Sequence, residues 1–181
     1  MAKEDVIKQQ LKVPTQKKYA FQMLVQLYQE RLYYFARKMV VTHDDANDVL
    51  QDSFLKAWKA IDRYRGDASL YTWLYRIVIN ESISLIEKRK REVKMFNQES
   101  IDYRVAHIKT DPYFNGSEIE RKLHEAVLKL PEKQQMVFNM KYFDELKYEQ
   151  ISEILETSVG ALKASYFHAK KKVEEEMLRL V

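Results

Sequence analysis

The sequence contains no cysteine, and only three glycines and three prolines occur among its 181 residues. Without cysteine the chain can form no disulfide, no thiolate nucleophile and no cysteine-ligated zinc or iron–sulfur site. Three glycines at these positions cannot assemble either of the common phosphate-binding loops, GxGxxG or GxxxxGK[ST]. The scarcity of turn-forming residues leaves little material for tight hairpins and therefore favours an all-helical chain.

Long hydrophobic runs are also missing. No stretch approaches the about 20 apolar residues that are needed to cross a bilayer. The N-terminus, Met1 to Lys18, is polar and has no apolar signal core. We therefore expect a cytoplasmic protein without membrane insertion. Hydrophobic residues make up 46% of the chain, which suits a folded protein, and the net charge of +4 is too small by itself to indicate a nucleic-acid partner.

Apolar residues recur at helical spacing in two blocks, residues 20–91 and residues 118–181. Between them, at residues 92–117, the periodicity fades and two breaker pairs, Asp-Pro and Asn-Gly, occur. Residues 1–19 form a polar N-terminal tail in this scheme. The sequence thus predicts an all-α fold with two small helical domains joined by a flexible linker.

The second block ends in the pattern of a helix-turn-helix. Two segments of helical spacing, 146–155 and 159–173, are separated by a short break, and four lysines but no acidic residue lie between positions 159 and 173. Phe167 lies away from the apolar stripe and is expected to be exposed. Such a helix suits phosphate contacts and base-edge contacts in a major groove. A merely solvated face of a helical hairpin is the alternative.

Acidic residues gather near one face of the second helix that is expected in the first block. A helix N-terminus attracts negative charge, which explains Asp44 and Asp45 but not Asp48 and Asp52. A di-metal carboxylate site would need a Glu-x-x-His motif, and the sequence has none. Since no nucleophile–base pair, metal-ligand spacing or cofactor loop stands out either, we expect no enzyme, no metal and no cofactor.

Three segments together resemble the ECF (extracytoplasmic function) sigma factors. DANDVLQDSF, at residues 45–54, resembles their polymerase-binding helix, and YRGDASLYTWLYRI, at residues 64–77, resembles their promoter-melting segment. SVGALKAS, at residues 158–165, is similar to their second promoter-reading helix. The resemblance runs from Phe21 to Leu178. It implies a sigma region 2-like domain at 20–91 and a region 4-like helix-turn-helix domain at 118–181.

The same resemblance implies a function in transcription initiation. The chain would bind core RNA polymerase, recognise and melt promoter DNA, and be held silent by an anti-sigma factor. A stand-alone helix-turn-helix regulator is the alternative, but it would leave the acidic helix and residues 64–77 without a purpose.

Site residues follow from the matched segments. The implied polymerase contacts are Asp45, Asp48, Gln51, Asp52 and Phe54. The implied contacts to the melted minus-ten-type element are Lys56, Tyr64, Arg65, Gly66, Asp67, Ala68, Ser69, Tyr71, Arg76, Asn80 and Lys88. The implied contacts to the minus-thirty-five-type element are Ser158, Lys163, Ala164, Phe167, His168, Lys170 and Lys171.

Aromatic stacking holds single strands, and Tyr64 and Tyr71 are better candidates for it than Trp73, which the spacing places in the core. Many relatives carry arginine where this chain has Ser165 and His168. Fewer guanidinium groups make fewer bidentate guanine contacts, so the promoter sequence that is recognised should differ from theirs.

Overall fold

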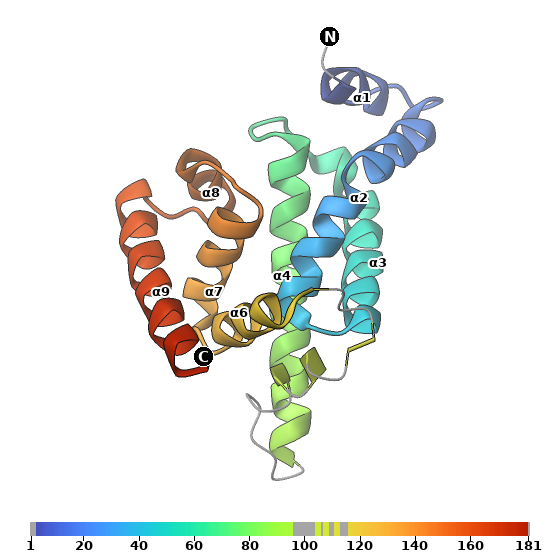
Figure 1. Ribbon diagram of the computed structural model, residues 1–181. Coiled ribbons are helices and arrows are strands. Elements are labelled where there is room, and N and C mark those ends of the chain that lie inside the picture. The colour runs from blue at the N-terminus through green and yellow to red at the C-terminus, as the bar shows by residue number, and fades with distance from the viewer. Residues whose placement is uncertain (1–2, 96–103, 106, 109–110, 113–115, 181) are drawn as a thin grey trace.

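The computed structural model describes residues 3–95, 104–105, 107–108, 111–112 and 116–180 (Figure 1). The first half contains α1 (Lys3–Leu11), α2 (Lys17–Val40), α3 (His43–Ala60), the 3₁₀ turn η1 (Ile61–Arg63) and α4 (Leu70–Met95). The second half contains α6 (Glu118–Leu128), α7 (Glu132–Phe138), the π-helical turn η2 (Asn139–Phe143), α8 (Tyr148–Leu155) and α9 (Val159–Leu180). The described part of the chain has no strand, and the prediction of two helical domains is confirmed.

In the first domain, α2, α3 and α4 pack around a common core (Figure 1). Leu24, Phe35, Leu74 and Tyr75 are completely buried in this core. Thr42 caps α3, because its hydroxyl oxygen accepts a hydrogen bond from a backbone N–H in the first turn.

In the second domain, α8 and α9 form the predicted helix-turn-helix. The turn between them passes through Glu156 in the left-handed conformation, with φ of 51°. The buried face of α9 carries Leu162, Ala169 and Val173, and Ile151 of α8 is completely buried. Pro131 lies directly before α7, where its missing N–H costs no helical hydrogen bond.

The N-terminal segment differs from the sequence prediction. Residues 3–11 form α1, where we expected part of a polar tail, and α2 begins at Lys17. Ile7 is the buried side chain of α1, while the other residues of the helix are polar or partly exposed. The inward apolar residues of α1 are Ile7 and Leu11, and two residues one turn apart are too few to give a recognisable helical period, so the sequence pattern could not reveal this helix.

The two domains are in direct contact in this structure. Asp144, which follows η2, accepts hydrogen bonds from Lys38 of α2 and from the hydroxyl of Tyr75 in α4. About four turns further along α4, Lys90 forms an ion pair with Glu132 of α7. Figure 1 shows the second domain beside α4, with α8 near the N-terminal end of that helix.

Part of the predicted linker is described and packs on the second domain. The side chain of Arg104 is 8% exposed and donates to the Gln135 side chain and to the backbone carbonyl of Leu128. Helix α4 also continues to Met95, past the predicted domain end at 91. The linker residues 96–103, 106, 109–110 and 113–115 lie outside the described part of the chain.

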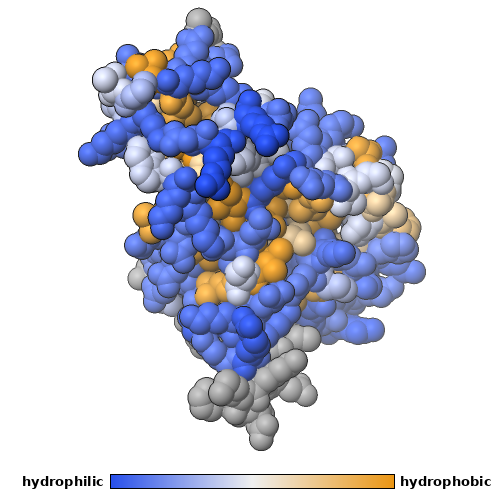
Figure 2. Space-filling model, turned by 180° about the vertical axis from the view of Figure 1, so that it is seen from behind, coloured by the Kyte–Doolittle hydropathy of each residue, from blue (hydrophilic) through white to orange (hydrophobic). Residues whose placement is uncertain are grey.

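Hydrophilic side chains cover most of the face seen in Figure 2, and apolar side chains show through in separate patches. Isolated apolar patches of this kind are ordinary on folded proteins. Among the described residues, no helix is both long enough and apolar enough to span a membrane.

Candidate nucleic-acid interface

One face of α3 is acidic and exposed. Asp48, Gln51, Asp52 and Leu55 recur at three- and four-residue intervals, so they lie on the same side of the helix, and all four are exposed. Leu55 is 50% exposed, although sequence reasoning did not select it. We call these four residues the α3 acidic face.

Two of the residues predicted to contact polymerase lie beneath this face. Asp45 is 4% exposed, and its carboxylate accepts a hydrogen bond from Arg89 of α4 at 2.7 Å. Phe54 is half-buried and packs against the core of the first domain. Both side chains therefore hold α3 in place rather than project from it.

The segment before α4, Tyr64 to Ser69, is a loop with two fixed ends and an exposed tip. The hydroxyl of Tyr64 donates to the carbonyl oxygen of Ala68, and its ring packs on Trp73 at 5.3 Å between ring centroids. The hydroxyl of Ser69 accepts from the Thr72 N–H at 3.0 Å, which caps α4. We call this segment the recognition loop.

The tip of the recognition loop is Arg65, Gly66 and Asp67, and all three residues are exposed. Gly66 has φ of 86°, a left-handed conformation that other residues adopt only with strain, and nothing lies within 4 Å of where its side chain would be. The backbone turn thus requires glycine, while the space around it stays open for a ligand.

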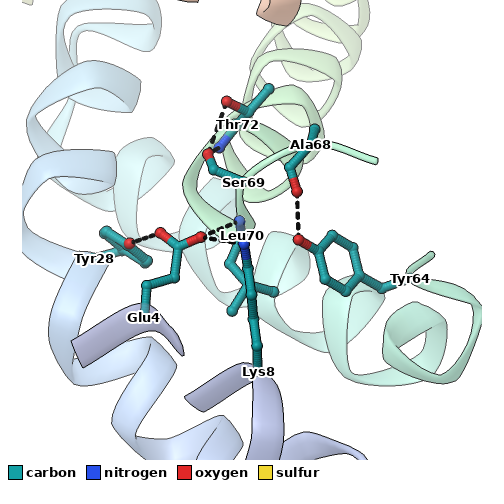
Figure 3. A network of polar contacts seen from close by, with 8 residues as sticks. All are labelled: Glu4, Lys8, Tyr28, Tyr64, Ala68, Ser69, Leu70 and Thr72. Carbon is teal, nitrogen blue, oxygen red and sulfur yellow. Dashed lines mark hydrogen bonds and ion pairs between the residues drawn. The ribbon is translucent and has the colours of Figure 1, made fainter. Parts of the chain in front are cut away.

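Helix α1 attaches to the base of this loop (Figure 3). The carboxylate of Glu4 accepts the Leu70 backbone N–H at 2.9 Å and the Tyr28 hydroxyl at 2.5 Å. Lys8 lies 3.0 Å from the same carboxylate. Burial alone would raise the pKa of Glu4, but its hydrogen bonds from Tyr28, Leu70 and Lys8 outweigh burial and lower the pKa below its ordinary value.

The aromatic residues of α4 are placed differently from the sequence prediction. Tyr71 is 8% exposed and packs between Tyr28 and Tyr75, with ring centroids 5.2 Å away in both cases. This burial raises the pKa of Tyr71 to about 12. Trp73, which we expected in the core, is only partly buried beside Tyr64. Tyr71 is thus a packing residue here, and Tyr64 and Trp73 are the aromatics next to the loop.

Beyond the loop, Arg76, Asn80 and Lys88 follow along α4 as the sequence predicts. Asn80 and Lys88 are exposed. Arg76 is engaged by the second domain, where it donates to the backbone carbonyl of Glu153 and pairs with Glu156 at 3.0 Å. Lys56 of α3 pairs with Glu81 at 2.6 Å on this side of the domain.

The outer face of α9 is exposed along its length. Phe167 is 66% exposed, and the other residues predicted to contact the minus-thirty-five-type element are exposed as well. Ser158 accepts a hydrogen bond from the Ala161 N–H and so begins the helix. Lys170 and Lys171 pair with Glu174 and Glu175 one turn further on. Among the described residues, no group of three or more His, Asp or Glu side chains could hold a metal ion.

Known proteins match both domains in the order found here. The family models Sigma-70 region 2 and Sigma-70, region 4 match residues 24–92 and 120–173. The RNA polymerase sigma-H factor of Pseudomonas aeruginosa is 30% identical over 172 residues, which cover 91% of this chain and 89% of that protein. The ECF RNA polymerase sigma-E factor of Haemophilus influenzae is also 30% identical, covering 91% of this chain and 90% of that protein.

Solved structures share the fold. The sigma factor RpoE from Bartonella quintana, in complex with the anti-sigma factor NepR, matches with a TM-score of 0.70 and 25% identity over 87% of this chain and 96% of that chain. CnrH, in complex with the cytosolic domain of CnrY, matches in fold with a TM-score of 0.68 and 21% identity over 97% and 96% of the two chains.

Proposed function

The chain belongs to the ECF subfamily of RNA polymerase sigma factors, and from this premise we propose how its surfaces divide the work of initiation. As a sigma factor it binds core RNA polymerase and directs promoter-specific transcription initiation. The observation that carries the proposal is the placement of three exposed surfaces on one chain: the α3 acidic face, the recognition loop and the outer face of α9.

The α3 acidic face is the proposed polymerase contact. Asp48, Gln51 and Asp52 supply charge and hydrogen-bond acceptors, and Leu55 supplies an apolar anchor. Asp45 and Phe54 contribute by fixing α3 against α4 and the core. Complementary charge steers such an encounter and suppresses wrong partners.

The recognition loop is the proposed site of base capture in the minus-ten-type element. Its exposed tip offers backbone groups and Arg65, and Tyr64 and Trp73 offer rings beside it. Arg76, Asn80, Lys88 and Lys56 form the basic and polar track for the strand. Base stacking contributes about 1–3 kcal/mol per base, which offsets the few kcal/mol that unstacking costs. No nucleotide hydrolysis is needed, and we propose that the chain catalyses no reaction itself.

The outer face of α9 is the proposed contact to the minus-thirty-five-type element. Lys163, Lys170 and Lys171 lie where they can contact phosphates, while Ala164, Phe167 and His168 present the side chains nearest to base edges. Ser158 lies at the helix N-terminus, where backbone N–H groups favour a phosphate.

The contact between the domains bears on how these surfaces are used. Arg76 is held by Glu153 and Glu156 of the helix-turn-helix, so in this arrangement part of the strand track is occupied. We propose that polymerase separates the two domains and sets their spacing on DNA. RpoE is found with the anti-sigma factor NepR, and CnrH with the cytosolic domain of CnrY. We propose an anti-sigma factor that covers the same surfaces here. Since core polymerase and the chromosome are its partners, we propose a cytoplasmic location.

Run-off transcription tests this function. Purified core polymerase and a library of genomic fragments would be combined with and without the chain, and discrete new transcripts are expected only with it. Asp48→Lys and Asp52→Lys together reverse the charge of the α3 acidic face. This double variant should abolish the transcripts, because the charge of the face no longer complements that of the polymerase surface. The control Glu30→Lys reverses one exposed charge on α2 and should retain them. No new transcripts from a folded chain would contradict the proposal.

A further inference from the structure

The recognition loop is anchored at its base by a residue 66 positions away in the sequence. Glu4 accepts the N–H of Leu70, the first residue of α4, at 2.9 Å. That N–H belongs to the group at a helix start that has no partner within the helix. Ser69 caps another of these N–H groups, that of Thr72, from within the loop. The C-terminal end of the loop is therefore held by two caps, of which one comes from α1.

Glu4 is itself held from two sides. The Tyr28 hydroxyl of α2 donates to one carboxylate oxygen at 2.5 Å, and Lys8 lies 3.0 Å from the other oxygen (Figure 3). Hydrogen bonds to an ionised carboxylate are stronger than those between neutral groups. The lowered pKa of Glu4 agrees with a carboxylate that stays charged in this position. Through this carboxylate the loop is tied to both α1 and α2.

The same cluster reaches the N-terminal end of the loop. Burial raises the pKa of the Tyr64 hydroxyl overall, while the positive charge of Lys8, which pairs with Glu4, acts to lower that pKa. Tyr64 in turn donates to the Ala68 carbonyl across the loop. Figure 3 shows Glu4 and Lys8 between Tyr28 on one side and Tyr64 on the other, next to Leu70 at the start of α4. The C-terminal end of the loop is thus bonded to a side chain of α1, and the charge of Lys8 lies toward its N-terminal end.

Helix α1 is short and contributes little to the core. It has nine residues and one buried side chain, Ile7, and a helix of this length is marginal on its own. It also precedes the segment that matches Sigma-70 region 2, which begins at residue 24. The polar contacts of Glu4 and Lys8 converge on the base of the recognition loop rather than on the core.

We infer that Glu4 is a positioning residue for the recognition loop and thereby helps to set base selectivity in the minus-ten-type element. This inference rests on the proposed function of that loop. A loop that is ordered before the base arrives loses less entropy on binding and holds its contacts in one geometry. Releasing the Leu70 N–H would let the loop sample other geometries, which accept the wrong base more readily. Glu4 does not itself contact DNA in this scheme.

The test uses holoenzyme made from the full chain and core polymerase. A promoter recovered from genomic fragments would be randomised separately in its minus-ten-type and minus-thirty-five-type elements, and the transcripts would be sequenced. Glu4→Ala should lower the preference for the favoured minus-ten bases roughly tenfold, the size expected from losing a helix cap. Preference in the minus-thirty-five-type element should not change. Glu4→Gln, which keeps an acceptor but loses the charge, should have a smaller effect.

Tyr28→Phe is the second variant, because it removes one hydrogen bond to Glu4 and keeps the buried ring. It should weaken minus-ten preference in the same direction, even if Glu4→Ala fails to fold. Glu30→Gln removes an exposed carboxylate from α2 and should leave both preferences unchanged.

A purely structural role for Glu4 gives a different outcome. Total transcript yield would fall, while the base preferences in the minus-ten-type and minus-thirty-five-type elements stayed as in the original chain. That result would overturn the inference about Glu4 and leave the proposed function standing. If the unchanged chain produced no promoter-specific transcripts at all, the proposed function would fail and the inference with it.

Discussion

The recognition loop and the outer face of α9 are both proposed to touch promoter DNA, yet they are built in opposite ways. Leu162, Ala169 and Val173 are buried on one side of α9, and this alone directs the opposite side outward. The recognition loop instead relies on side chains from α1, α2 and α4. A single substitution on the outer face of α9 should therefore leave the rest of that face in place. The geometry of the recognition loop should instead change when residues in distant segments are substituted.

Two aromatic residues test this contrast most strongly. Tyr71 is 8% exposed and Phe167 is 66% exposed, although the sequence suggested DNA contact for both. Tyr71→Ala should lower the free energy of unfolding by about 3–5 kcal/mol, since it leaves a cavity among packed rings. Phe167→Ala should change that free energy by less than about 0.5 kcal/mol and yet weaken promoter binding. Urea unfolding and promoter binding by holoenzyme would measure both. Equal destabilisation by the two changes would contradict the assignment of Tyr71 to packing and of Phe167 to the exposed DNA-contacting face.

The junction between the two domains should respond to pH through His124. Burial lowers the pKa of His124 to about 4, and the charges of Lys38 and Arg37 act in the same direction. Folding therefore favours the neutral ring. The stability that the neutral ring of His124 contributes is fully present above about pH 6.5 and is lost as the pH falls toward 4. Because the ring is partly exposed, we expect a loss of about 2 kcal/mol over this range.

His124→Gln should flatten the dependence of unfolding free energy on pH above about 4.5. The carboxyl groups with lowered pKa, Glu4 and Glu120, have an ordinary value of 4.5, so their stabilising contribution is lost only below that pH, and the change above it comes from His124. An unchanged pH profile in the variant would show that His124 is not the group responsible.

Only a small change in stability is expected from the lysines on the outer face of α9. Lys170 and Lys171 form only exposed pairs with Glu174 and Glu175, so replacing both with Gln should cost less than about 1 kcal/mol of stability. The salt dependence of promoter binding should nevertheless decrease by about one unit of slope for each phosphate that the variant no longer neutralises.

Lys172→Gln is the matched control on the same helix, because Lys172 lies toward Gln134 at 3.1 Å and is not among the proposed DNA contacts. The salt dependence of promoter binding by Lys172→Gln should have the same slope as that of the original chain. An equal decrease in slope per lysine for the double variant and for Lys172→Gln would mean that α9 contributes charge without a defined DNA-binding face.

Local patterns predicted the second domain well. The apolar spacing of residues 159–173 and the break before it matched α8, α9 and their turn, because each helix buries a stripe that recurs in the sequence. The hydroxyls of Thr42 and Ser69 cap the starts of α3 at His43 and α4 at Leu70, and such caps depend on neighbouring residues only.

Long-range contacts explain what the sequence did not reveal. Glu4 meets a backbone N–H 66 residues away, and Arg76 meets a carbonyl 77 residues away, and no periodic pattern encodes either contact. The positions of Tyr71 and Trp73 were also not foreseen. The buried face of α4 runs through Tyr71, Leu74, Tyr75 and Val78, which places Trp73 on its flank. Leu55 was missed because an exposed leucine resembles a core residue in a sequence pattern.

The two DNA-contacting surfaces are proposed to work together only when polymerase sets their spacing. The most direct measurement is the affinity of one recovered promoter for the free chain and for the holoenzyme, at the same salt concentration. We expect the holoenzyme to bind at least about 100-fold more tightly, because both surfaces then engage one DNA molecule. Equally tight and specific binding of the promoter by the free chain would contradict this central proposal.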